Sequence, residues 1–502
     1  MGLKRMMACH GFIEAAKGVM VVVLLGVLLL LPGLNRSWAA EDEPKEDGII
    51  KVTANKIEED VTDVPQSITV IDEITLGEKE IKDIPDVIRE IPNMRHTPNH
   101  GNAINFRGLN TSMFTSNNPV VIYIDGVPYS HAYGFDASLV NVERIEVLRG
   151  PQGTLYGKDA IGAVINIVTQ DPGDTWQGAF NIDYGSFNTL SGSLNLSGPI
   201  VKDRLFLGVN GFYQQSDGWI ENDYPGGDEN ADRETDSKIG AYLLCKPTDR
   251  FEARLTVAND YSKDHWDHGY GLPGGSRVTD FERDDAEHVR YDEDTFQDVE
   301  SSTQSLDMSY AFDRATLTST TTHRVLDTRG DYDVDFGENP VFDGLIQFND
   351  SETDTWTQEL RLSSNRTEGL RWVLGLYLDI EEHEQGPYGM QFPNFDPVTY
   401  AYLGNFAMNA ESVTDSNTQA LFGQIMVPFG RGFELTLGGR YQRIEKEMDL
   451  DTYYLPVGVG GDAFYSLGAD KSWTEFLPKV ALSYEINDGW TAYASWSRGY
   501  MP

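Results

Sequence analysis

Apolar and polar residues alternate along most of the chain after about residue 175. In the stretch 250–261 nearly every second residue is apolar, so one face of a predicted strand is apolar and the other is largely polar. The same period of two recurs in segments 204–213, 238–246, 356–362 and 433–441. Each segment has about ten residues, the length that a tilted strand needs to cross a bilayer. The pattern predicts a transmembrane antiparallel β-barrel over residues 174–502.

The predicted strands, about 13 or 14 in number, are joined alternately by short turns and long polar segments. The long segments are 216–236, 262–297, 385–415 and 445–471, and we expect each of them to be a loop. This alternation is typical of outer-membrane barrels, whereas a soluble β-sandwich more often has connections of similar length.

The chain ends at Pro502, soon after a strand-like segment at 490–498. An open barrel would leave unpaired backbone groups in lipid, at a cost of several kcal/mol each. We therefore expect the barrel to be incomplete in this chain, with its C-terminal strands missing from a truncated product or fragment.

Residues 55–173 have a different pattern, which predicts a compact α+β domain. Segment 67–71 alternates like a strand, and Asp83 followed by Pro85 is typical of a helix start. The apolar runs 119–124 and 163–169 resemble buried strands, and the first of them ends in an Asp-Gly turn.

The first 54 residues do not fit either domain. Residues 1–40 contain Lys4 and Arg5, an apolar run of about 14 residues and a small-residue cleavage pattern, which together predict a secretory signal peptide. An uncleaved anchor is the alternative. Residues 41–54 are charged at first and therefore flexible, and then reach a short β-prone segment that starts at Ile49. This segment could pair with a sheet edge of another protein or form the first strand of the next domain.

A formal net charge of −40 excludes nucleic acid as a partner attracted by long-range electrostatics. The acidic residues either keep long loops solvated or attract a divalent cation or cationic ligand. Asp331, Asp333 and Asp335 alternate like calcium ligands, but no glutamate follows at the position an EF-hand requires. His265 and His268, with His288 further along, give only a weak signal for a metal. We expect no cofactor and no resident metal.

Several motifs resemble those of TonB-dependent receptors. They lie at 105–108, 121–128 and, most specifically, 142–157, followed by 160–169. Further matches lie at 357–363, 372–377, 435–441 and 477–482, so the resemblance extends over nearly the whole chain after the signal peptide. It implies an N-terminal plug domain inside the barrel and a location in the bacterial outer membrane, in contact with outer-membrane lipid and lipopolysaccharide.

The resemblance also implies roles for particular residues. The TonB box, which pairs by strand addition with a periplasmic energy-coupling protein, would be Ile49, Ile50, Lys51, Val52, Thr53 and Ala54. Arg107 and Arg149 match plug arginines that pair with barrel carboxylates, and Glu359 is the expected partner because Leu360 and Leu362 take the lipid face. Other plug-motif positions are Gly108, Asp125, Gly126, Glu146, Gly150, Gly153, Tyr156 and Gly157, and their glycines are expected in turns with positive φ.

The implied function is energised uptake of a scarce ligand, a ferric siderophore by family precedent, with no covalent chemistry. Cobalamin, haem or an oligosaccharide are alternative ligands within the class. A truncated product that does not transport is a further alternative. A secreted β-rich enzyme is disfavoured because no nucleophile, base and oxyanion site can be assembled from these residues, and the plug disfavours a passive porin.

Overall fold

The computed structural model describes residues 51–97, 103–112, 117–134, 139–265, 279, 287–335, 337, 344–366, 369–487 and 490–501. The predicted signal peptide, most of the flexible segment and the box residues Ile49 and Ile50 lie outside the described residues. In the part of the chain that is described, no helix is both long and apolar enough to cross a membrane.

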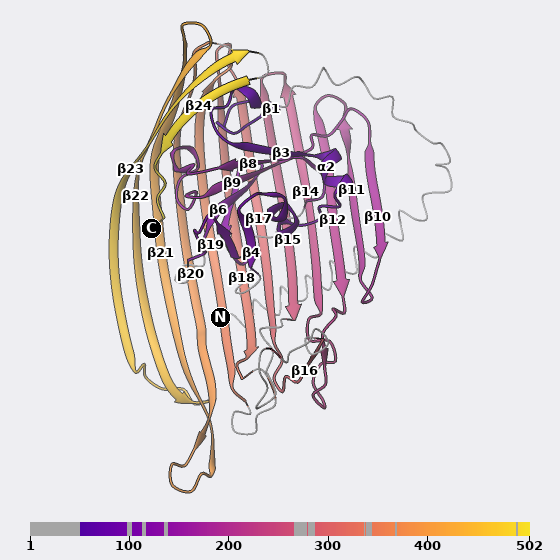
Figure 1. Cartoon of the computed structure of the whole chain (residues 1–502), viewed down its shortest axis with the longest axis vertical. Coiled ribbons are helices and arrows are strands. Elements are labelled where there is room, and N and C mark those ends of the chain that lie inside the picture. Colours follow the sequence, from indigo (N-terminus) through magenta and orange to yellow (C-terminus); the bar gives the residue numbers. More distant parts are fainter. Residues whose placement is uncertain are drawn as a thin grey trace, which may run out of the picture. The chain divides into compact units, whose positions relative to one another are not determined.

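Thirteen strands of the described residues form one sheet, which we call the barrel sheet. All neighbouring pairs are antiparallel, and the strands follow chain order (Figure 1). The strands are β10 (Gln177–Tyr184), β11 (Leu190–Val201), β12 (Leu205–Ser216), β14 (Glu234–Thr248), β15 (Phe251–His265), β17 (Phe296–Ala311), β18 (Ala315–Asp333), β19 (Ile346–Ser364), β20 (Arg371–Phe395), β21 (Tyr402–Phe429), β22 (Phe433–Pro456), β23 (Tyr465–Asn487) and β24 (Trp490–Ser497). The predicted class of an antiparallel barrel, incomplete in this chain, is confirmed, because β10 and β24 do not pair within the described residues.

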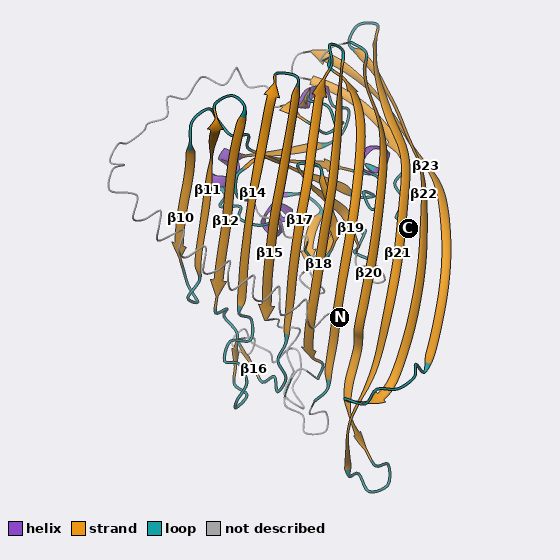
Figure 2. Cartoon of the chain, turned by 180° about the vertical axis from the view of Figure 1, so that it is seen from behind, coloured by secondary structure: helices purple, strands orange, loops and turns teal. Residues whose placement is uncertain are grey.

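Side chains alternate across the barrel sheet as the sequence pattern predicts. In β20, Leu374, Leu376 and Leu378 are about half exposed on the outer face, whereas Val373 and Tyr377 are buried on the inner face. Figure 2 shows the sheet from behind, with its strands running nearly side by side over their whole length. The outer face is therefore the one suited to lipid.

The prediction of long loops is wrong for two segments, which are largely strands. Segment 385–415 is mostly strand, because β20 continues to Phe395 and β21 begins at Tyr402. Segment 445–471 likewise contains the end of β22 and the start of β23, which stay paired as far as Thr452 with Tyr465. Polar side chains mark where a strand leaves the membrane, but the ladder consists of backbone hydrogen bonds and can continue into water. In segment 216–236 the strand residues are the last one of β12, the short strand β13 (Glu221–Asn222) and the first ones of β14. Much of segment 262–297 lies outside the described residues.

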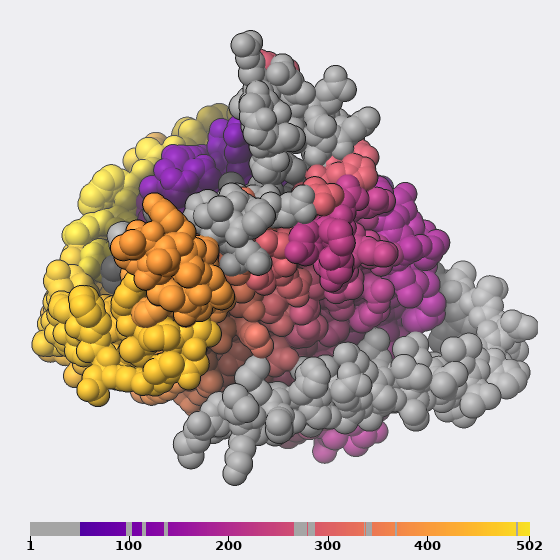
Figure 3. Space-filling view, turned by 90° about the horizontal axis from the view of Figure 1, so that it is seen from below, coloured from indigo at the N-terminus to yellow at the C-terminus, as the bar shows by residue number. Residues whose placement is uncertain are grey.

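Residues 51–169, the plug domain, pack against the inner face of the barrel sheet (Figure 1), and Figure 3 shows them beside the yellow C-terminal strands. Their main sheet has the order β3-β8-β9-β6-β7, with β6 and β9 parallel. The elements are β1 (Lys51–Val52), β2 (Glu59–Asp60), η1 (Val61–Asp63), β3 (Ile68–Asp72), α2 (Glu73–Glu78), α3 (Ile84–Glu90), β4 (Met94–Thr97), β5 (Ala103–Phe106), β6 (Asn117–Ile124), β7 (Val127–His131), β8 (Val142–Arg149), α4 (Gly153–Tyr156) and β9 (Ala163–Thr169).

The predicted local signals of the plug domain are confirmed. Asp83 caps α3 by accepting a hydrogen bond from the backbone N–H of Asp86, and Pro85 lies in the first turn. The core contains the buried Ile84, Val87 and Ile88 of this helix together with Ile122 and Ile165 of the central strands.

An arginine on the outer face of β20 should destabilise the folded protein in a bilayer. We expect Leu376→Arg to cost about 2–4 kcal/mol if the position lies near the membrane midplane, because the charge must enter hydrocarbon. Val398→Arg, at an exposed hairpin tip, is the matched control and should cost little. Urea unfolding in lipid vesicles measures both, and equal unfolding midpoints would contradict the assignment of the lipid face.

Candidate functional site

The described part of the predicted box is docked inside the plug domain. The backbone N–H of Thr53 donates to both carboxylate oxygens of Glu146, at 2.9 and 3.0 Å, and Glu146 is fully buried. Asn166 donates to the hydroxyl of Thr53, and Tyr156 donates to the carbonyl of Ala54 at 3.1 Å. Lys51 and Val52 form β1 and pair with β2 inside the plug domain, whereas Thr53 and Ala54 are held by hydrogen bonds to side chains. A competing strand can replace both kinds of contact.

Lys56, two residues after the box, makes a buried ion pair with the barrel wall. Its ammonium lies 2.5 Å from the carboxylate of Glu359, and the two side chains are 8% and 13% exposed. Arg361 contacts the same carboxylate at 2.9 Å. The ammonium also lies over the rings of Tyr123 and Tyr156, 5.6 and 5.1 Å from their centroids. This charge is satisfied by an ion pair and by aromatic faces at once.

The predicted arginine partners of Glu359 are wrong in the described structure. Arg149 donates instead to the hydroxyl of Thr69 at 2.7 Å, because β8 pairs with β3 and directs this side chain along the plug sheet. Arg107 sits in a turn with φ of 51° and stacks on the ring of Phe106. Glu359 does lie on the inner face, as expected, but its plug partner is Lys56. That Glu359 latches the plug stays a prediction.

Lys56 could not be identified from the sequence, because its partner lies 303 residues away and no local motif surrounds it. The same holds for a second buried cluster just after it. Arg371 of β20 contacts both Glu59, at 2.5 Å, and Glu434, at 2.6 Å. Asn55 accepts a hydrogen bond from Gln424 of β21 at 2.9 Å. Lys479 of β23 donates to the same side chain at 3.4 Å. The first residues after the box are thus bound to four barrel strands, β19, β20, β21 and β23.

The remaining plug-motif residues stabilise turns and close contacts. Asp125 accepts hydrogen bonds from the backbone N–H and the hydroxyl of Thr169. The expected positive φ is observed at Gly108, Gly126, Gly150 and Gly157. At Gly157 a Cβ atom would also lie 2.8 Å from the guanidinium of the buried Arg440. Gly153 does not have this conformation. It begins α4, where a Cβ atom would lie 3.1 Å from Leu477.

A cavity of about 500 Å³ opens between the plug domain and strands β18 to β23, and we call it the outer cavity. Lys158 at its wall contacts Asp379 at 2.9 Å and Glu381 at 3.8 Å. Burial raises the pKa of the neighbouring Asp159 to about 6, although Lys158 opposes the shift. Burial and the nearby His383 lower the pKa of His131 to about 4, so this imidazole is neutral at pH 7. The cavity therefore offers closely balanced charges together with neutral rings, which suits a compact polar ligand.

A second cavity, of about 540 Å³, lies on the other side of the same plug loops, and we call it the inner cavity. It is lined by Lys56, Glu359 and Arg361, and it reaches Asn365 and Arg366 in the short turn between β19 and β20. Threonine and serine side chains from β18 and β19 line one side of it, and residues of the plug domain form most of the rest. The ion pair of Lys56 and Glu359 therefore borders a space large enough for a small solute.

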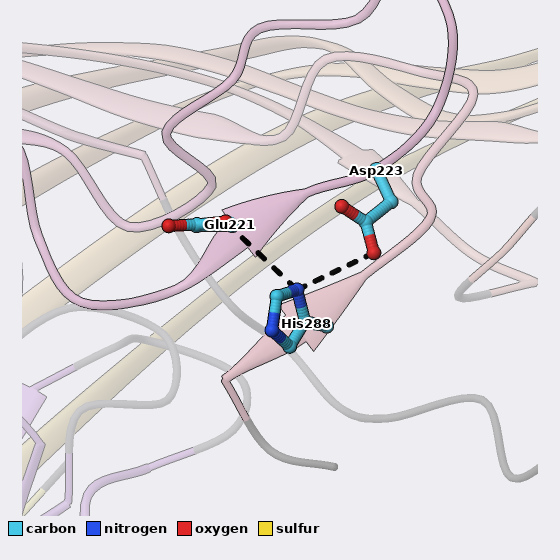
Figure 4. Close-up of side chains that lie close together, drawn as sticks. All are labelled: Glu221, Asp223 and His288. Atoms are coloured by element: carbon cyan, nitrogen blue, oxygen red, sulfur yellow. Dashed lines mark ion pairs between the residues drawn. The ribbon is translucent and has the colours of Figure 1, made fainter. Parts of the chain in front are cut away.

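Two groups of acidic residues lie outside these cavities. Glu221 and Asp223 lie 4.0 and 3.3 Å from Nδ1 of His288, where β13 pairs in parallel with β16 (His288–Val289) (Figure 4). All three side chains are exposed, and such a group commonly exists without an ion, so we assign no metal to it. Asp333 and Asp335 from the predicted alternating series approach Asp292, whereas His268 lies outside the described residues.

An α+β domain fixed by buried ion pairs to the inner face of a bilayer-length antiparallel sheet defines the class of plugged membrane barrels. Residues 60–164 match the family model "TonB-dependent Receptor Plug Domain", and residues 246–502 match "TonB dependent receptor-like, beta-barrel". The chain belongs to the TonB-dependent receptor family, whose members are bacterial outer-membrane proteins.

Similar proteins include the pesticin receptor of Yersinia enterocolitica, 34% identical over 206 residues, which are 40% of this chain and 30% of the relative. The iron-regulated outer membrane virulence protein of Vibrio cholerae is 31% identical over 40% of this chain and 32% of its own length. The matches thus span about a third of these curated relatives. The solved ferric yersiniabactin uptake receptor FyuA from Yersinia pestis has the same fold, with a TM-score of 0.73 and 21% identity over 87% of this chain and 65% of that one.

Loss of the Glu359 carboxylate should loosen the plug domain. We expect Glu359→Lys to cost about 3–5 kcal/mol, because Lys56 would remain buried without its counter-charge. Adding Lys56→Met to Glu359→Gln should recover most of the loss seen in Glu359→Gln alone, since both charges are then gone. Glu411→Lys on the exposed face of β21 is the control. Protease protection of the plug domain measures the effect, and unchanged protection in Glu359→Lys would contradict the latch.

Alkaline pH should strengthen the fold through Lys56. Burial lowers the pKa of Lys56 from 10.5 to about 8, against opposition from Glu359. Between these values the unfolded chain binds more protons than the folded protein, so the free energy of unfolding rises with pH by at most about 1.4 kcal/mol per unit. Urea unfolding of the wild type and Lys56→Met between pH 7.5 and 10.5 isolates this group. A constant difference between the two proteins would refute the assignment.

Proposed function

We propose that this chain acts in energised uptake of a ferric siderophore across the bacterial outer membrane. The observation that carries the proposal is the continuity of residues 51–59. The box segment pairs with Glu59 and Asp60 and is bound by Glu146, and the buried ion pair of Lys56 with the barrel wall follows within three residues of Thr53. Tension applied at the box therefore acts on these contacts inside the plug domain and then on the ion pair that fixes the plug to the wall.

The ligand assignment rests on relatives. Proteins similar to this chain include receptors named for iron regulation and for ferric yersiniabactin, and another solved relative is the ferric-catecholate import receptor Fiu from E. coli K-12. The outer cavity supports capture of a compact polar chelate, because it combines charged, imidazole and phenol side chains. Such binding and release need no covalent step, so the proposed role is not enzymatic.

The proposed partners follow from the same mechanism. A periplasmic TonB-type protein would pair with residues 49–54, because the outer membrane has no nucleotide energy source and work must arrive through this segment. The outer face of the barrel sheet would contact outer-membrane lipid and lipopolysaccharide. Export to this membrane would depend on residues 1–40 as a cleaved signal peptide.

Cobalamin is a second candidate ligand, because the vitamin B12 transporter BtuB of Vibrio vulnificus is 34% identical over 26% of this chain. A bacterial host without its own iron-siderophore and cobalamin receptors distinguishes the two. Expression of this chain should restore uptake of radioactive iron from a ferric siderophore panel and leave labelled cobalamin outside. Restored cobalamin uptake alone would replace the siderophore assignment, and no uptake of either would reject transport.

A proline in the box should separate binding from uptake. Val52→Pro removes a backbone N–H from the strand that the energy-coupling protein must pair with. We expect siderophore binding at the cell surface to remain and energised iron uptake to fall to the level of cells without the receptor. Asp47→Pro, upstream of the box, is the matched control and should transport normally. Equal uptake by both variants would contradict the role of residues 49–54.

A further inference from the structure

The two cavities lie on opposite sides of one thin wall. The outer cavity extends along the barrel to Lys446, Met448 and Lys471, toward the long hairpins. The inner cavity extends the other way, to Thr316 and Asn365 beside the short turns. In this family's architecture long connections are extracellular and short turns are periplasmic. The two spaces therefore belong to the two sides of the plug domain.

Among the described residues, only Tyr123 and Tyr156 line both cavities. Tyr123 comes from the central strand β6, and Tyr156 comes from the last residue of α4. Their rings pack edge to face with centroids 5.0 Å apart, and the hydroxyl of Tyr123 donates to the carbonyl of Tyr156 at 2.9 Å. Both side chains are nearly buried, at 5% and 7% exposure. Two phenol rings therefore separate two spaces of similar size.

Tyr123 and Tyr156, which form the wall between the two cavities, are supported by residues 53–56. The hydroxyl of Tyr156 donates to the carbonyl of Ala54, and the ammonium of Lys56 rests over both rings. Withdrawal of residues 53–56 would remove a hydrogen bond from Tyr156 and the cation from both phenol faces. A third cavity, of about 350 Å³ near β14 to β17, shares no lining residue with the inner cavity and so offers no comparable passage in the described structure.

We infer that Tyr123 and Tyr156 form the gate of the permeation route, and that the route passes between the plug domain and strands β18 to β20. Removal of Ala54 and Lys56 from the two rings opens it and joins the outer cavity to the inner one. This inference rests on the proposed transport function for its purpose, but the connection between the cavities can be measured without a ligand. In the closed state the two tyrosine rings block the route.

The test uses cysteines at either side of the wall in a Cys245→Ser background. Thr318→Cys places a thiol in the inner cavity, and Thr355→Cys places one in the outer cavity. A membrane-impermeant maleimide added outside intact cells should label the Thr355→Cys protein readily and the Thr318→Cys protein slowly. With Tyr123→Ala and Tyr156→Ala added, labelling of Thr318→Cys should rise about tenfold or more, because the rate follows the fraction of open molecules.

Two control variants separate the gate from general loosening. Tyr123→Phe with Tyr156→Phe removes both hydroxyl hydrogen bonds but keeps both rings and the Lys56 ammonium over them, so labelling should rise far less than in the double alanine variant. Tyr129→Ala removes a buried plug tyrosine that lines neither cavity and should also leave the route closed. Unchanged labelling of Thr318→Cys in the double alanine variant, with normal labelling of Thr355→Cys, would overturn the inference. Faster labelling in Tyr129→Ala would overturn it as well.

A second measurement decides the matter if the double alanine variant does not fold. With the wild-type tyrosines, labelling of Thr318→Cys should increase when the energy-coupling protein is present and fall back when Val52→Pro is added. Labelling that never responds to the coupling protein overturns the gate. Opening of the gate without any iron uptake would reject the siderophore proposal and leave the gate standing, so the two failures are distinguishable.

Discussion

The ion pair between Lys56 and Glu359 joins three features that otherwise belong to separate parts of the molecule. It fixes the segment after the box to the barrel wall, it borders the inner cavity, and it places a cation over the two tyrosines that separate the cavities. Desolvation offsets much of the attraction between two buried charges, but loss of one partner leaves the other charge uncompensated. The contact therefore fixes the position of the segment without contributing much net stability, and both charges must leave the site together.

Hydrophobic packing stabilises the fold of the plug domain, and polar pairs help to fix it to the barrel wall. Its own core is apolar and centres on Ile84, Ile122 and Ile165, so it can stay folded while it moves. Contacts with the barrel wall include buried polar pairs, as in Lys158 with Asp379 and Arg371 with Glu59, beside an apolar cluster in which Leu155 meets Phe422 and its neighbours. Polar contacts are directional and can be exchanged with water, so the pairs at this interface fix the orientation of the plug domain as well as its position.

The position of the box adds a mechanical argument. Thr53 is bound by the carboxylate of Glu146, and the aromatic wall begins only a few residues later. A pull from the periplasm would thus act on Thr53, Ala54 and Lys56 in order of sequence. The large sheet around them is tied by backbone hydrogen bonds along strands of up to 28 residues, so it resists the same force. Only the contacts of the leading segment would yield.

The sequence by itself determined the class of fold, the division into plug and barrel, the outward-facing residues of the barrel sheet and the identity of the plug motifs. These features follow from local periodicity, capping residues and turn chemistry, which act over a few neighbouring positions. The extent of the hairpins beyond residues 385 and 445 was misjudged because backbone pairing does not depend on polarity. Only the tertiary structure decided that Glu359 meets Lys56 instead of Arg107 or Arg149, and that Tyr123 and Tyr156 divide two cavities. Those contacts join residues far apart in the chain, and no local pattern specifies which buried charge or ring will face which across a folded lumen.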